Sequence, residues 1–190
     1  GVLRVLCQWL ASRSPCRGLQ SRAARAPLRR MLRADLAAGL TVMVGSGERA
    51  DQTAAGQTGQ IVSGQVRAAV SGISRAAVSR LAIAYEPLWA IGDGHNAEPN
   101  EISPTLKAIR NVGNEMTDDG ATSVLRVLYG GSVNAENVGS YMGLPECDGC
   151  LVGGACIRAD EFATMIRRAA EDIPAAHPLG PPSSGMRRGT

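Results

Sequence analysis

A glutamate at the end of an apolar run is the first residue in this sequence that could do chemistry. Glu86 follows residues 81–85 (LAIAY), which have the continuous apolar character of a buried parallel strand. A carboxylate at the end of such a strand would be partly desolvated, which raises its pKa toward that of a useful general base. The alternative is an ordinary strand-end glutamate that pairs with an arginine.

Two glycine turns could bind a phosphate group. Gly130-Gly131-Ser132 follows the apolar run 124–129, Gly153-Gly154 follows the run 150–152, and a predicted helix comes after each turn. Glycine lets backbone N–H groups approach an anion closely, and a helix N-terminus favours negative charge. Two such turns on adjacent strands predict a phosphate site, placed where α/β barrels carry theirs. The alternative is that these glycines only allow tight packing between strand and helix.

The segment after Glu86 has the composition of a lid. Pro87 and Trp89 stiffen its start, and Gly92-Asp93-Gly94 makes its tip flexible. Such a loop can close over a site and exclude water. Most glycine-rich loops are only turns, so this hypothesis depends on the residues around it.

The five cysteines do not form the pattern of a disulfide framework. Their number is odd and their spacing uneven in a chain of 190 residues: Cys7, Cys16, Cys147, Cys150 and Cys156. This usage indicates a reducing compartment. Cys147 and Cys150 form a lone C-x-x-C that lacks a second pair at zinc spacing, and both histidines are distant in sequence. We therefore expect no metal site, and packing of these two thiols in a strand rather than zinc binding or redox chemistry.

The elements that must position these residues alternate regularly. Apolar runs predict strands at 41–44, 81–85, 124–129 and 150–152, and helical spacing predicts helices at 31–38, 56–79, 104–116 and 160–172, with a short helix after Asn134. Gly39 is the expected C-cap of the first helix. Continuously apolar strands joined by helices indicate a parallel sheet covered by helices, with right-handed crossovers. Ligands bind such sheets at the carboxyl ends of the strands, where Glu86 and both glycine turns fall.

Composition and charge divide the chain into three parts. Hydrophobic residues make up 44% and charged residues 19%, which is globular, and no apolar run approaches the roughly 18 residues of a membrane span. Aromatic residues are only 3%, which disfavours a base-stacking surface. We expect residues 1–30 to be an arginine-rich leader that is disordered or aberrant in origin. Residues 31–172 should form the folded part of the chain. The tail 173–190, which is rich in Pro, Gly and Ser, should be disordered. A transit peptide, or an arm for nucleic acid or anionic lipid, is the alternative for the leader.

Three motifs in register resemble the triosephosphate isomerase family. They are 84–92 (AYEPLWAIG), 128–134 (LYGGSVN) and 148–155 (DGCLVGGA), supported by 37–41 (AAGLT) and 55–58 (AGQT). The resemblance covers about residues 31–172 and implies an α/β fold of the (β/α)8 TIM-barrel type, of which only the last four β/α units are recognisable. It implies a cytoplasmic, cofactor-free isomerase of glycolysis and gluconeogenesis, which interconverts dihydroxyacetone phosphate and D-glyceraldehyde 3-phosphate. The expected partner is this triose phosphate, not nucleic acid or a membrane, and a homodimer is one possible assembly.

The resemblance also implies a role for each matched residue. Glu86 would be the base that moves a proton between two substrate carbons through an enediolate. The phosphate would be bound through backbone N–H groups of Gly92, Ser132, Gly153 and Gly154. The lid would hinge at Pro87, Leu88 and Trp89, and Tyr129 and Ser132 would hold it closed through the backbone near Ala97 and Gly94.

Several positions depart from the family's pattern. The family's first-strand Asn and Lys and its fourth-strand Gly-His-Ser-Glu-Arg motif are not found in the sequence, and residues 44–48 (VGSGE) differ from the usual Val-Gly-Glu. In the lid, His95 stands where the family usually has Lys, and Asp93 and Asn96 where Thr is usual. The alternative function is therefore a catalytically impaired half-barrel that binds phosphate compounds or a partner half-barrel.

Overall fold

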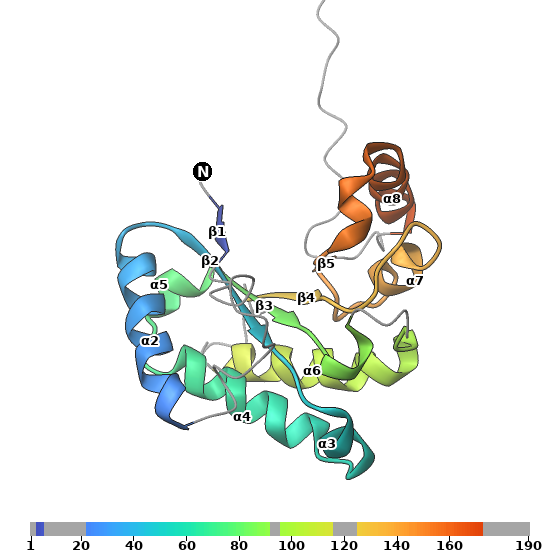
Figure 1. Cartoon of the computed structure of the whole chain (residues 1–190). Helices are drawn as coiled ribbons and strands as arrows, with labels where there is room; N and C mark the ends of the chain where they lie inside the picture. The colour runs from blue at the N-terminus through green and yellow to red at the C-terminus, as the bar shows by residue number, and fades with distance from the viewer. Residues whose placement is uncertain (1–2, 6–21, 92–95, 116–124, 173–190) are drawn as a thin grey trace, which may run out of the picture.

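The chain folds around a parallel sheet, and the computed structural model describes residues 3–5, 22–91, 96–115 and 125–172 (Figure 1). The strands pair in sequence order, and every pair is parallel. They are β1 (Leu3–Val5), β2 (Thr41–Ser46), β3 (Leu81–Tyr85), β4 (Arg126–Tyr129) and β5 (Gly149–Cys150). Parallel strands added always on the same side are the winding of a β/α barrel, so this is the architecture of part of one.

Helices connect the strands and cover one face of the sheet. They are α2 (Arg22–Ala37), α3 (Ala50–Ala54), α4 (Thr58–Val70), α5 (Arg75–Val78), α6 (Pro99–Glu115), α7 (Val138–Met142) and α8 (Ala159–Asp172), with 3-10 helices η1 (Leu88–Ala90) and η2 (Gly154–Ile157). In Figure 1, α2, α4 and α6 follow one another along the sheet, and α7 and α8 lie at its β5 end. None of the helices in the described ranges is long and apolar enough to cross a membrane.

The two faces of the sheet carry separate apolar clusters. Outward-pointing strand residues such as Val44, Ile83 and Val127 belong to the large core, together with residues of α2, α4 and α6. Met43, Ala82 and Ala84 form a smaller cluster on the opposite face. Every residue of β3 is buried, which is the physical reason for its unbroken apolar sequence.

The structure confirms two of the predicted features and corrects several predicted boundaries. β3 and the Gly39 C-cap are confirmed, the latter with φ of +82°. The helix predicted for 56–79 is two helices, since the backbone leaves the helical conformation at Ser71, with ψ of 120°, and Gly72 then adopts φ of +72°. α6 begins at Pro99 rather than at residue 104, since Pro99 also suits a first helical position. β2 continues to Ser46, whereas β4 begins only at Arg126 and β5 is limited to Gly149–Cys150.

Two elements lie within the segment 1–30 that the sequence sets apart as a leader. β1 pairs with β2 in the register Leu3 to Thr41, and the sheet thus has a fifth strand beyond the four predicted. α2 begins at Arg22, so the boundary predicted after residue 30 falls inside this helix. Residues 6–21 and the predicted tail at 173–190 lie outside the described residues.

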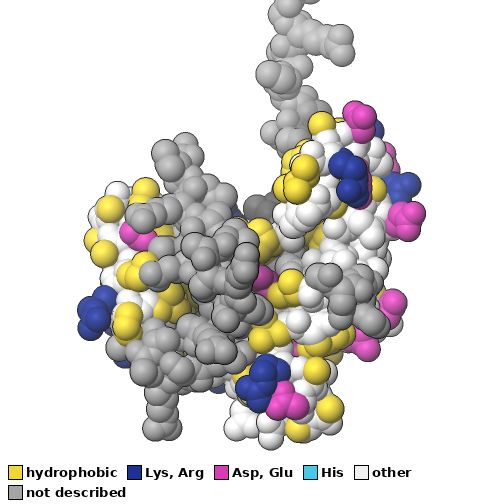
Figure 2. Space-filling view, viewed as in Figure 1, with side chains coloured by type: hydrophobic (Ala, Val, Ile, Leu, Met, Phe, Trp, Pro, Cys, Tyr) yellow, Lys and Arg dark blue, Asp and Glu magenta, His cyan; other side chains and the backbone are white. Residues whose placement is uncertain are grey.

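The surface of the α8 region is partly apolar. Ile157 and Ile166 are 84% and 55% exposed. Figure 2, in the same view as Figure 1, shows hydrophobic side chains beside charged ones in this region. α8 packs on α7 through its other side, where Met165 is buried.

Candidate active site

Glu86 is held at the carboxyl end of β3, between the two neighbouring strands. Its N–H donates to the carbonyl of Ser46 at 2.7 Å, and the N–H of Gly130 donates to the carbonyl of Tyr85 at 2.8 Å. A Cβ added at Gly45 would lie 2.7 Å from Glu86 Oε1, and one added at Gly130 would lie 2.7 Å from Glu86 Cγ. Because such contacts are too short, glycine at both positions provides the space that this side chain occupies.

The environment of Glu86 suits a general base. Burial raises the pKa of its carboxyl group to about 7, and no described cation opposes this effect. The alternative of a strand-end glutamate paired with an arginine is therefore not supported by the described residues. A carboxylate with this pKa can accept a proton and return it near neutral pH.

A buried glutamate that the sequence analysis did not select holds the start of the predicted lid. Glu48 is fully buried, and its Oε1 accepts hydrogen bonds from Trp89 Nε1 at 3.1 Å and from the Tyr85 hydroxyl at 3.1 Å. The carbonyl of Glu48 accepts a further bond from the N–H of Leu88 at 3.0 Å. Two predicted hinge residues are thus fastened to the loop after β2. Burial and the charge of Glu48 raise the pKa of Tyr85 well above its ordinary value.

The loop that carries Glu48 is itself fixed by a buried glutamine. Gln65 Oε1 accepts bonds from the Ser46 hydroxyl at 2.8 Å and from the N–H of Gly47 at 3.0 Å, and its Nε2 donates to the carbonyl of Gly47 at 2.9 Å. A Cβ at Gly47 would overlap the carbonyl oxygen of Glu86, at 1.8 Å. The glycine therefore permits the close approach of this loop to the end of β3. The unusual sequence at 44–48 was the available signal for this arrangement.

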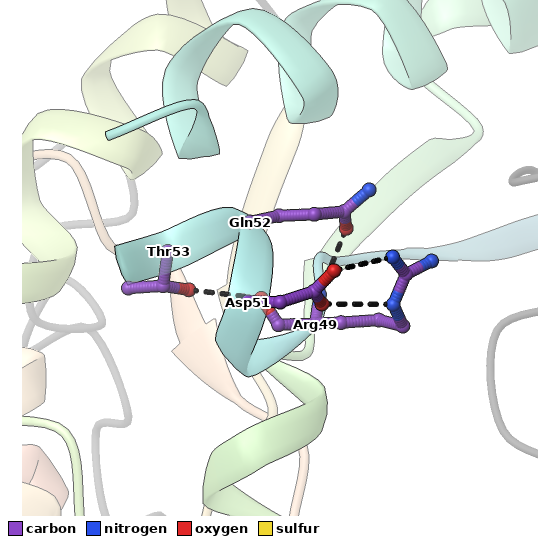
Figure 3. Close-up of polar contacts among 4 residues, drawn as sticks. All are labelled: Arg49, Asp51, Gln52 and Thr53. Atoms are coloured by element: carbon purple, nitrogen blue, oxygen red, sulfur yellow. Dashed lines mark hydrogen bonds and ion pairs between the residues drawn. The ribbon is translucent and has the colours of Figure 1, made fainter. Parts of the chain in front are cut away.

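The first turn of α3 closes the same loop (Figure 3). The N–H of Arg49 donates to Gln52 Oε1 at 3.0 Å, which is half of a capping box. The Arg49 guanidinium binds both carboxylate oxygens of Asp51, at 2.9 and 2.6 Å. Thr53 donates from its hydroxyl to Glu48 Oε1 at 2.9 Å. The helix start thus adds a third donor to the buried carboxylate.

The two glycine turns follow neighbouring strands, as predicted, but their glycines differ in purpose. A Cβ at Gly131 would lie 2.0 Å from the Tyr129 hydroxyl, so this glycine is required by packing. A Cβ at Gly153 or Gly154 would meet nothing within 4 Å, and both residues are exposed. Tight packing therefore does not explain the second pair, whose backbone is open to solvent.

Ser132 lies in a turn with defined geometry. Its carbonyl accepts a bond from Asn137 Nδ2 at 2.9 Å. Asn134 Oδ1 accepts from the N–H groups of Glu136 and Asn137, and Asn137 Oδ1 accepts from the N–H of Asn134 at 2.8 Å. The side chains of two asparagines thus shape the turn that leads from β4 into α7.

A second tyrosine, which the sequence analysis did not select, lies beside Tyr129 at the end of the predicted lid. The Tyr141 hydroxyl donates to the carbonyl of Ala97 at 2.9 Å. Tyr129 packs against Tyr141 with ring centroids 4.4 Å apart, and its buried hydroxyl lies close to the Tyr141 hydroxyl and to the backbone of Ala97. Gly92 and Gly94, which complete the predicted lid, lie outside the described residues, as does His95.

Together, the ends of β2, β3 and β4 hold the half-buried Glu86 carboxyl group between two glycines, with Leu88 and Trp89 bound to the loop after β2 and two glycine turns after β4 and β5. Among the residues that the structure describes, no three His, Cys, Asp or Glu side chains are grouped to hold a metal ion. The arrangement is suited to moving a proton on a small phosphorylated substrate.

Comparison with known proteins agrees with the motifs. The family model described as "Triosephosphate isomerase" matches residues 21–169. A triosephosphate isomerase of Rhodococcus jostii is 43% identical over 133 residues, which are 70% of this chain and 51% of that protein. One of Symbiobacterium thermophilum is 39% identical over 140 residues, 74% of this chain and 55% of that protein. The chain spans about half the length of these relatives.

Proposed function

This chain belongs to the triosephosphate isomerase family, and from this premise we propose that it interconverts dihydroxyacetone phosphate and D-glyceraldehyde 3-phosphate. The observation that carries the proposal is the half-buried Glu86 carboxyl group, which lies between Gly45 and Gly130 with its pKa raised to about 7. The proposal is also supported by the position of Glu86 and of the two glycine turns, which follow β3, β4 and β5 of one parallel sheet.

In the proposed reaction Glu86 removes a proton from the carbon beside the substrate carbonyl. The electron pair moves into the carbonyl to give an enediolate, and Glu86 returns the proton to the neighbouring carbon. The pKa of about 7 lets one group perform both transfers near neutral pH. Donors to the enediolate oxygens are also needed, and in the resembled family these come from the first and fourth strands.

The remaining site residues bind the substrate's phosphate and exclude water. The exposed backbones of Gly153 and Gly154 and the turn at Ser132 suit a phosphate at the carboxyl ends of β4 and β5. Binding energy at this remote group would favour closure of the lid, hinged at Pro87, Leu88 and Trp89. Closure protects the enediolate, which in water could eliminate its phosphate.

The family also supports expectations about the cellular setting. We expect work in glycolysis and gluconeogenesis, in the cytoplasm, without a cofactor and without nucleic-acid or membrane partners. A homodimer is one possible assembly. Sedimentation of the purified chain would decide the last point.

The test is turnover of glyceraldehyde 3-phosphate by the chain and by two matched variants. Glu86→Gln removes the base with little change in shape, and Glu115→Gln makes the same chemical change at an exposed carboxylate that pairs with Arg67. We expect Glu86→Gln to lose at least about 10²-fold in rate, a typical worth of a general base, and Glu115→Gln to keep its rate.

Binding of inorganic phosphate, measured by calorimetry, separates chemistry from binding in the same variants. Glu86→Gln should bind phosphate as the unchanged chain does. Turnover that survives in Glu86→Gln would overturn the assignment of the base. Phosphate binding without turnover in the unchanged chain would instead support the half-barrel alternative.

A further inference from the structure

A cavity of about 270 Å³ lies at the amino end of the sheet, opposite to the end that carries Glu86. It is enclosed by α2, by α5 and by the turn that joins α4 to α5 (Figure 1). Arg80, which lines the cavity, comes directly before β3, whereas Glu86 comes directly after it. Because a strand of five residues spans about 17 Å, the cavity is separate from the candidate active site.

Two arginines line this cavity, and the backbone holds both of them in place. Arg33 Nη2 donates to the carbonyl of Ser71 at 2.8 Å, and Arg80 Nη1 donates to the carbonyl of Leu36 at 2.8 Å. A Cβ at Gly72 would lie 2.3 Å from Arg33 Nη2, so this glycine leaves the space that the guanidinium occupies. The two cations are therefore positioned before any ligand binds.

These contacts use only part of the donor capacity of the two side chains. A guanidinium carries five N–H donors in a planar fork, and within the described part of the chain Arg33 and Arg80 each donate one hydrogen bond. No Asp or Glu is among the described residues that line the cavity. The remaining donors of both arginines therefore face no carboxylate there.

The alternative is that both arginines only cap the ends of helices. Leu36 lies in the last turn of α2, and Ser71 is the C-cap of α4. The carbonyl end of a helix carries about half a negative elementary charge, so two such ends offset about one of the two positive charges. Capping thus explains one bond of each arginine, but about one positive charge remains, and it favours an anion in the cavity.

The size and lining of the cavity limit the ligand to a small one. The volume lies just below the range of about 300–1,000 Å³ that is typical of pockets for drug-sized ligands. Guanidinium forks match the oxygen geometry of phosphate and bind it through paired hydrogen bonds. The hydroxyl of Ser74, which makes no capping bond to α5, is a further donor in the lining, and Ile73 and Ala77 add apolar surface.

We propose that Arg33 and Arg80 form a binding site for a phosphate group, which either inorganic phosphate or a small phosphomonoester supplies. Both guanidiniums donate to the phosphate oxygens, and the Ser74 hydroxyl is a third donor. The site lies at the other end of β3 from Glu86, so a ligand here does not compete with a substrate at Glu86. The inference does not depend on the proposed isomerase function.

NMR of the chain labelled with nitrogen-15 in its arginines tests the site. The Nε–H signals of Arg33 and Arg80 are assigned by their loss in Arg33→Lys and Arg80→Lys, and they report on this cavity rather than on the turns after β4 and β5. We expect both signals to shift saturably when inorganic phosphate or glycerol 2-phosphate is added. A lower Kd for the ester would identify a phosphomonoester as the ligand, and a lower Kd for the free ion would identify inorganic phosphate.

Two variants of nearly equal shape separate the effect of charge from that of size. Ser74→Glu adds a carboxylate to the lining while both arginines stay in place, and it should raise the Kd for phosphate at least about tenfold. Ser74→Gln adds a neutral side chain of similar size and should bind phosphate nearly as the unchanged chain does. Since Ser74 is exposed, both variants should fold, which circular dichroism checks.

Two results would overturn the proposal. One is that the Nε–H signals of Arg33 and Arg80 do not shift with either probe, or shift without saturation. The other is that Ser74→Glu and Ser74→Gln bind phosphate with equal Kd, since the charge of the cavity would then have no part in binding.

Discussion

The side chain of Glu86 occupies space that two glycines leave open, because a Cβ at Gly45 or Gly130 would lie 2.7 Å from one of its atoms. Its raised pKa follows from burial in this space and not from a neighbouring charge. At the scale of single residues, the absence of a Cβ at Gly45 and Gly130 is therefore what allows the Glu86 side chain to take this position.

Gly130→Ala should displace Glu86 toward solvent. We expect the pKa of Glu86 to fall from about 7 toward its ordinary value of 4.5, because the group would regain hydration. The measurement is an NMR titration of carbon-labelled glutamate side chains. Gly64→Ala, where a Cβ on α4 meets nothing, is the control and should leave this pKa unchanged. An unaltered Glu86 pKa in Gly130→Ala would contradict the packing argument.

At the scale of elements, the structure depends on connections that join distant segments. Glu48, at the end of the loop after β2, accepts bonds from β3, from α3 and from the lid start. Gly72, with its positive φ, lies in the turn that separates α4 from α5. Both features decide where an element begins or ends.

Trp89→Phe should destabilise the chain by about 1–3 kcal/mol, because it removes a hydrogen bond to a buried carboxylate. Urea denaturation gives this free energy. Arg67→Gln breaks an exposed ion pair with Glu115 and should change this free energy much less. Equal losses in the two variants would mean that the indole contact with Glu48 contributes no more than a surface pair.

Gly72→Ala should lower the free energy of unfolding by roughly 1 kcal/mol or more. Alanine is strained at φ of +72°, and its Cβ would lie 2.3 Å from Arg33 Nη2. Gly64→Ala should instead stabilise α4 slightly, because its conformation is helical and its surroundings are open. Thermal unfolding of both variants checks the opposite signs.

At the scale of the whole molecule, the ionisation of Glu86 makes the free energy of unfolding depend on pH. The pKa of Glu86 is higher in the folded chain than in the unfolded chain, so the folded state binds more protons between pH 4.5 and about 7. The contribution of Glu86 to stability is therefore complete below pH 4.5 and is lost as the pH rises through 7. The difference between a pKa of 4.5 in the unfolded chain and about 7 in the folded chain corresponds to about 3 kcal/mol in the free energy of unfolding.

Glu86→Gln should accordingly become more stable than the unchanged chain as the pH rises. Urea denaturation at pH 5 and pH 8 measures the difference, which should grow by up to about 3 kcal/mol toward pH 8. A pH-independent difference would show that Glu86 titrates alike in the folded and unfolded chains.

The sequence predicted the parallel order of elements, because continuous apolar runs and helical spacing are local signals. The same holds for Glu86, whose place at a strand end follows from residues 81–85. It did not predict that Glu48 would hold Trp89, or that Tyr141 would reach Ala97, because these contacts join segments far apart in the chain. The pairing of β1 was missed for a different reason, because a strand of three residues gives almost no periodicity.

The most direct test of the central claim is exchange of carbon-bound hydrogen. Dihydroxyacetone phosphate is incubated with the chain in deuterated water, and NMR follows the incorporation of deuterium beside the carbonyl. If Glu86 is the base, exchange should be catalysed by the unchanged chain and by Glu115→Gln, and it should fall at least about 10²-fold in Glu86→Gln. Equal exchange in Glu86→Gln and in the unchanged chain would contradict the account.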